Sequence, residues 1–112
     1  MSSPTPPAGP TLHEAELASG PSGAVLRGAE IDLATAVARR QAGENVVVCG
    51  PDLKANRALA QQIEAGVGPY VRGVPHTRTA GPLALPHFQQ ADEDHPGHTF
   101  YETDQRHSRK RP

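Results

Sequence analysis

The sequence contains no tryptophan and few other aromatic residues, which together make up 4% of its 112 positions. Only 36% of the residues are apolar, and 12 prolines and 11 glycines interrupt the chain. A core built from this composition is small and aliphatic, because aromatic side chains supply much of the buried area in other domains. Length and composition therefore predict one small domain that is rich in loops.

Several classes of protein are excluded by what else is scarce. A single cysteine, Cys49, excludes an internal disulfide framework and a cysteine-rich zinc site. No signal-peptide pattern and no apolar run of membrane-spanning length is present, so we expect a soluble protein. With a formal net charge of −1, the chain lacks the excess of basic residues expected of a protein that binds nucleic acid stably. Transient contact between an enzyme and nucleic acid is still compatible with this charge.

The chain divides into three predicted regions. Residues 1–10 contain four prolines among small residues and predict a disordered leader. Residues 11–104 are expected to form a single α+β domain of catalytic type. Residues 105–112 hold the one concentrated basic run, RHSRKRP, which predicts a solvated tail.

Three segments show the periodicity and end signals of helices. In the first, Thr11 is placed as an N-cap with Glu14 three residues later, as in a capping box. The second has apolar residues at helical spacing and ends at Gly43, and the third begins at Pro51 and Asp52. The predicted helices span residues 11–20, 29–44 and 51–66.

Strand signals occupy the rest of the domain. Residues 45–50, NVVVCG, form the short β-branched run expected of a buried strand. Prolines recur from position 69 onward and exclude a long helix there. Three short strands are predicted instead: YVRGV at 70–74, LALPHFQ at 83–89 and HTFYE at 98–102. The predicted fold is α+β, with N-terminal helices followed by a small, mainly antiparallel sheet.

Four of the six histidines lie between residues 74 and 102, and three of them, His76, His87 and His98, are evenly spaced. Histidine suits acid and base catalysis, because a neutral ring can accept a proton while a charged ring donates one. We therefore predict these three histidines as catalytic residues. The nearby cations and hydroxyls are the predicted substrate-binding residues: Arg72, Arg78, Thr79, Thr99 and Tyr101.

Strand alternation limits which of these side chains can meet. His98 shares a face with Phe100 and Glu102, whereas Tyr101 points the other way. His98 and Tyr101 can thus face one site only where a bulge or bend intervenes. His95, in the predicted turn ADEDHPG, is expected to be a surface residue.

Two other kinds of function stay open. Histidines beside the carboxylates of DEDH and Glu102 are good metal ligands, so a His-metal nuclease acting on DNA, or a metal hydrolase, is one alternative. No H-E-x-x-H and no paired C-x-x-C is present, and GVGP lacks the pattern of a nucleotide-binding loop, so no cofactor is expected. A non-enzymatic interaction module with structural or pH-responsive histidines is the other alternative.

The string ENVVVCGPDLKANRALAQQIEAGVGP, followed by GPLALPHFQ and GHTFYE, resembles the C-terminal toxin modules of bacterial polymorphic toxins of the Rhs and contact-dependent-inhibition type. The resemblance covers roughly residues 29–104. Many such modules are similar to the barnase, EndoU, colicin and RelE group of metal-independent ribonucleases. The resemblance implies a nuclease delivered as part of a larger effector into the cytoplasm of a rival cell, where it cuts RNA and is neutralised by a cognate immunity protein. It places the acid and base among His76, His87 and His98, with Arg78 on phosphate.

Overall fold

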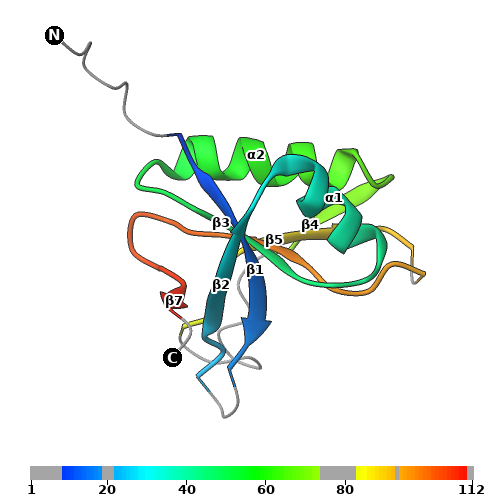
Figure 1. The fold of residues 1–112 in the computed structure, drawn as a ribbon. Helices are drawn as coiled ribbons and strands as arrows, with labels where there is room; N and C mark the ends of the chain where they lie inside the picture. The colour runs from blue at the N-terminus through cyan, green and yellow to red at the C-terminus, as the bar shows by residue number, and fades with distance from the viewer. Residues whose placement is uncertain (1–8, 19–21, 74–82, 93, 111–112) are drawn as a thin grey trace, which may run out of the picture.

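The computed structural model describes residues 9–18, 22–73, 83–92 and 94–110. Within these ranges the chain forms one mixed seven-stranded sheet, ordered β4-β5-β6-β3-β1-β2-β7, with two helices packed on it (Figure 1). The strands are β1 (Thr11–Leu17), β2 (Val25–Ile31), β3 (Val46–Cys49), β4 (Tyr70–Gly73), β5 (His87–Gln90), β6 (Thr99–Tyr101) and β7 (Arg109–Lys110). The helices are α1 (Leu33–Gln41) and α2 (Leu53–Ala65).

The predicted order of N-terminal helices and then a sheet is wrong, because the domain begins with the β1–β2 hairpin. The Ala18 N–H donates to the Ala24 carbonyl at 2.9 Å and closes this hairpin. Thr11 and Glu14, which fit a capping box, predict a helix here, but they lie in a strand whose buried residues, Leu12 and Ala15, are three positions apart. A shift in the strand register between His13 and Ala15 produces that spacing, since an irregularity of this kind moves the alternation by one residue.

The prediction of a small sheet made by the C-terminal strands alone is also wrong, because all the described strands lie in one mixed sheet with four antiparallel and two parallel pairings. β5 pairs with β4 and β6 in antiparallel fashion, as expected of the C-terminal strands. β6, however, pairs in parallel with β3, so that Val46 stands beside Thr99 and Val48 beside Tyr101. The C-terminal strands therefore extend one continuous sheet and do not form a small sheet of their own.

The central strand and two of the predicted helices are confirmed, although the helix predicted at 29–44 begins only at Leu33, because residues 29–31 belong to β2. All four residues of β3 are buried, as its β-branched run predicts. The Asp32 carboxylate caps α1 by accepting from the Thr35 N–H at 2.8 Å, and Asp52 caps α2 in the same manner. Gly43, at a φ of 81°, follows α1 in a conformation that favours glycine. Neither described helix has the length and apolarity needed to cross a membrane.

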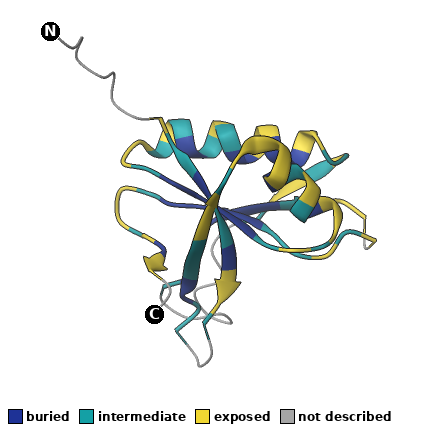
Figure 2. Cartoon of the chain, viewed as in Figure 1, coloured by how far each residue is buried: buried dark blue, intermediate teal, exposed yellow. Residues whose placement is uncertain are grey.

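The sheet has two different faces. On one, here called the helix face, the buried residues of α1 and α2 pack against Leu12, Val46, Val48, Phe88 and Tyr101. The opposite face, here called the second face, has its own apolar cluster, in which no described helix residue takes part: Ala15, Val25, Val47, Cys49, Leu85 and Phe100. Figure 2 shows buried residues along the central strands and exposed ones on the outer side of α1. Neither described helix packs on Phe100, so the predicted histidine site is expected on the second face.

Candidate functional site

Two of the predicted catalytic histidines meet on the second face of the sheet. His87 is the first residue of β5 and pairs with Phe100 of β6, and His98 precedes Phe100 by two positions. Because side chains two apart on a strand share a face, His98 lies diagonally opposite His87. The two imidazole rings are edge to face, with centroids 4.5 Å apart and planes at 75°.

The aromatic ring of Phe100 forms the base of this histidine pair. Its centroid is 5.8 Å from that of His87 and 5.3 Å from that of His98. Phe100 itself is 6% exposed, which makes it a packed part of the core. The rings of His87 on β5, Phe100 on β6 and His98 just before β6 therefore support one another, and this packing restricts the rotamers of both histidines.

A small pocket opens beside the pair. It has a volume of about 90 Å³ and is lined by apolar and small residues around the two imidazoles: Leu17, Gly23, Ala84, Leu85, His87, His98 and Phe100. Pockets that enclose whole ligands measure roughly 300–1,000 Å³. A substrate can therefore present only one group to this pocket, and the rest of the substrate has to lie across the surface around it.

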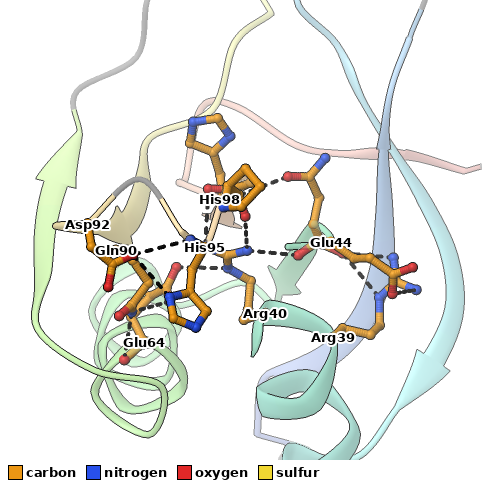
Figure 3. Close-up of polar contacts among 11 residues, drawn as sticks. Arg39, Arg40, Glu44, Glu64, Gln90, Asp92, His95 and His98 are labelled. Carbon is orange, nitrogen blue, oxygen red and sulfur yellow. Dashed lines mark hydrogen bonds and ion pairs between the residues drawn. The ribbon is translucent and has the colours of Figure 1, made fainter. Parts of the chain in front are cut away.

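A buried ion pair positions the segment that leads to His98 (Figure 3). The guanidinium of Arg40 and the carboxylate of Glu64 are both 0% exposed, with Arg40 Nε and Glu64 Oε1 2.9 Å apart. The remaining guanidinium nitrogens of Arg40 donate to the carbonyls of Pro96, at 2.8 Å, and Gly97, at 3.1 Å. These two residues directly precede His98, so the pair between α1 and α2 fixes one of the two histidine segments.

The same network also holds the strand that contains His87. Gln90, at the other end of β5, donates from Nε2 to Oε2 and to the backbone carbonyl of Glu64, each at 2.9 Å. The His98 N–H in turn donates to Asn45 Oδ1 at 2.8 Å, immediately before β3. Sequence reasoning missed Arg40 and Glu64, because their partners come from distant elements and leave no local pattern.

The predicted substrate-binding residues that the structure describes are not brought to the histidine pair. Thr99 and Tyr101 are buried on the helix face, at 0% and 1% exposure, with the alternation that the sequence predicted. Arg72 is exposed and pairs with Phe88, whose side chain belongs to the helix-face cluster. The sheet thus separates all three from the histidine pair. His76, Arg78 and Thr79 lie outside the described residues.

Asp92 and Glu102 are engaged elsewhere and do not surround the histidine pair, and Glu93 lies outside the described residues. Asp92 accepts from the backbone of Asp94 and contacts His95 Nδ1 at 3.0 Å, and this contact lowers the pKa of the Asp92 carboxyl. Glu102, 5% exposed, accepts three hydrogen bonds from Gly50 and Ser108. Within the described ranges, no three His, Cys, Asp or Glu side chains are grouped as metal ligands. The described residues therefore give no geometric support to a metal-binding site.

Comparison with known proteins returned no match to this chain among family models, curated proteins or solved structures.

Proposed function

We propose that the protein is an endoribonuclease that needs no metal ion and uses His87 and His98 as its acid and base. The supporting observation is that the two imidazole rings, 4.5 Å apart, line one pocket on the second face. Cleavage of RNA by its own 2′-hydroxyl requires two proton transfers at neighbouring oxygens of one phosphodiester. Two imidazoles beside one small pocket are the right groups for both transfers, and His87, at 2% exposure, has to turn a ring nitrogen toward the pocket to take part.

In this reaction the neutral ring removes the proton of the 2′-hydroxyl, and the 2′-oxygen attacks the adjacent phosphorus. The charged ring donates its proton to the 5′-oxygen as the bond between that oxygen and phosphorus breaks. The products are a 2′,3′-cyclic phosphate and a 5′-hydroxyl. Because one ring has to be neutral while the other is protonated, the rate is expected to follow a bell-shaped pH profile.

The size of the pocket favours a polymeric substrate over a small molecule. At about 90 Å³, it has room for part of a phosphodiester group but not for a nucleotide. A strand laid across the second face can present one phosphate to the pocket while its sugars and bases stay outside.

The biological setting of the proposal comes from the resemblance to polymorphic toxin modules. We propose delivery into a rival cell as part of a larger effector, action on RNA in its cytoplasm, and neutralisation by a cognate immunity protein. Arg78 stays the proposed cation for the charge that develops on phosphorus, since such a reaction needs a donor there. Arg72, Thr99 and Tyr101 are omitted from the proposed site.

The test is cleavage of total RNA in excess EDTA by the wild-type chain, with mass spectrometry of the new ends. We expect 2′,3′-cyclic phosphates, and a loss of at least about a hundredfold in rate for His87→Gln and for His98→Gln. His95→Gln is the matched control, because His95 lies on the surface beside Asp92 and away from the pair. Its rate should equal that of the wild type.

Three outcomes would contradict the proposal. Intact RNA in EDTA combined with divalent-dependent cutting of DNA would favour the metal nuclease. Full activity of both pair variants would remove the histidines from the chemistry. Absence of nuclease activity under all conditions, together with harmless expression in bacteria, would favour the non-enzymatic interaction module.

A further inference from the structure

The C-terminal basic segment, here residues 105–110, is docked on the second face. Glu102 Oε2 accepts from both the N–H and the hydroxyl of Ser108, each at 2.7 Å, while Oε1 accepts from the Gly50 N–H at 3.2 Å. The Ser108 hydroxyl also lies 3.4 Å from the Cys49 sulfur, a member of the second-face cluster. The segment is thus tied to a buried carboxylate and is not a free tail at these positions.

Backbone pairing adds a second attachment. β7 runs parallel to β2 at the edge of the sheet, with Arg109 beside Leu26 and Lys110 beside Arg27. Strand pairing fixes the backbone without using the side chains. The side chains of Arg109 and Lys110 are exposed and stay available to a ligand.

A pocket of about 400 Å³ lies along this segment, and five of its six lining residues are basic or polar: Leu83, Gln105, Arg106, His107, Ser108 and Arg109. In residues 103–110, Arg106, Arg109 and Lys110 stand against a single carboxylate, that of Asp104. The adjacent Glu102 carboxylate is already engaged by the donors described above. A concave surface with an excess of cations is suited to phosphate groups.

This pocket adjoins the histidine pocket through one short segment. Leu83 lines the basic pocket, while Ala84 and Leu85 line the histidine pocket. Arg106 Nη1 donates to the Ala84 carbonyl at 2.8 Å, so this hydrogen bond links a residue of the basic pocket to a residue of the histidine pocket. Along the strand, His98 and Glu102 are four residues apart on the same face, a span on the order of 13 Å at strand rise.

We propose that the basic pocket binds the backbone phosphates of single-stranded RNA on one side of the phosphodiester held at the histidine pair. The inference rests on the proposed function and names the path of its substrate. Arg106 and Arg109 line the path, and Lys110 extends it along the sheet edge. These side chains would bind phosphate groups and not bases, so they position the RNA strand without selecting a base sequence.

The test measures binding separately from cleavage. The probe is a short, fluorescently labelled 2′-O-methyl oligoribonucleotide, which has no free 2′-hydroxyl to attack, so the wild-type chain can be titrated without cutting it. The test variant is Arg109→Gln with Lys110→Gln. The matched control is Lys54→Gln with Arg57→Gln on α2, which removes the same two charges from the helix side.

We expect the Kd of the test variant to rise about tenfold and the slope of log Kd against log salt to fall by about 1.4, the value for two lost phosphate contacts on a single strand. The control should stay within about twofold of the wild type, because its charges lie away from the path. Equal shifts in both variants, or no shift in the test variant, would overturn the inference. Circular dichroism of both variants checks that the fold is kept.

The outcomes also separate this inference from the proposed function. If the probe binds through Arg109 and Lys110 but the wild type cuts no RNA, the phosphate path stands and the catalytic proposal fails. If the wild type cuts RNA but the test variant binds the probe as tightly as the wild type does, the catalytic proposal stands and the path fails.

Discussion

The imidazole of His87 on β5 lies directly over Gly73, its cross-strand partner on β4. The two residues are paired in register, and a Cβ atom added to Gly73 would collide with His87 Nε2 and its neighbouring ring carbons. Gly73 therefore provides the space in which the His87 ring sits, and aromatic rings that cover a glycine on the next strand stabilise such pairs. The glycine is part of what aims His87 at His98.

Gly73→Ala is expected to push the His87 ring out of its position. Overpacking of this kind costs about 1–3 kcal/mol of unfolding free energy, and the displaced ring should also lower RNA cleavage. Urea unfolding measures the stability, with Gly9→Ala as the control because nothing lies within 4 Å of its added Cβ. In Gly73→Ala with His87→Ala the collision is gone, so a cost equal to the sum of the two single variants would contradict this explanation.

Glu64→Gln is expected to destabilise the protein by about 3–5 kcal/mol, because it leaves the buried Arg40 charge without its counter-charge. The matched control is Glu44→Gln, whose carboxylate is half exposed and pairs with Arg39 at 3.1 Å. Removal of that surface pair should cost less than about 1 kcal/mol. Chemical unfolding measures the free energy of unfolding of both variants. Similar decreases would show that the buried Arg40–Glu64 pair contributes no more to stability than the surface Arg39–Glu44 pair.

Glu102→Gln is expected to release the C-terminal segment while the rest of the fold stays intact. A glutamine puts an amide N–H₂ where one carboxylate oxygen accepted hydrogen bonds, so a donor of Gly50 or Ser108 loses its acceptor, at a cost of about 1–3 kcal/mol. Limited trypsin digestion should then cut first after Arg106 and Arg109. Glu30→Gln, an exposed change on β2, should leave the digestion pattern as in the wild type.

The Cys49 thiol is expected to resist alkylation in the native protein. Its side chain is 4% exposed, and burial raises the pKa of the thiol above its ordinary value, so little thiolate forms near neutral pH. Iodoacetamide should label it only after denaturation. Rapid labelling of the native chain would contradict the buried position.

The raised pKa of Cys49 also predicts a loss of stability at high pH. The folded chain keeps the thiol proton to a higher pH than the unfolded chain, so this contribution is complete below the ordinary thiol pKa of about 8.5 and declines as the pH rises beyond it. The stability difference between the wild type and Cys49→Ala should therefore shrink between about pH 7 and about pH 10. The packing energy lost with the sulfur is the same at both pH values, so it does not affect the change in this stability difference.

Local patterns in the sequence predicted the features that depend on neighbouring residues. The β-branched run of β3 indicated a buried strand, and the alternation of His98, Phe100 and Tyr101 indicated which of them share a face. The histidines at 87 and 98 meet because antiparallel β5 and β6 are adjacent both in the chain and in the sheet. A pairing of that kind follows from short-range order alone.

Features that depend on distant partners could not be predicted. The irregularity in β1 gives Leu12 and Ala15 the spacing of a helix, and it is defined by pairing with β2 and β3 on either side. The Arg40 and Glu64 contact requires α1 and α2 to be packed already. The docking of Ser108 likewise depends on a carboxylate that is buried only in the folded chain.

The parallel pairing of β3 with β6 has a consequence for protein synthesis. The β1–β2 hairpin, β3 and both helices precede β6 in the chain, so His98, directly before β6, is made only after these elements. A growing chain that stops before β6 holds His87 without the second ring. In the proposed enzyme, the ribosome would therefore have to pass His98 before its product could cut RNA, and a chain released before β6 would be inert.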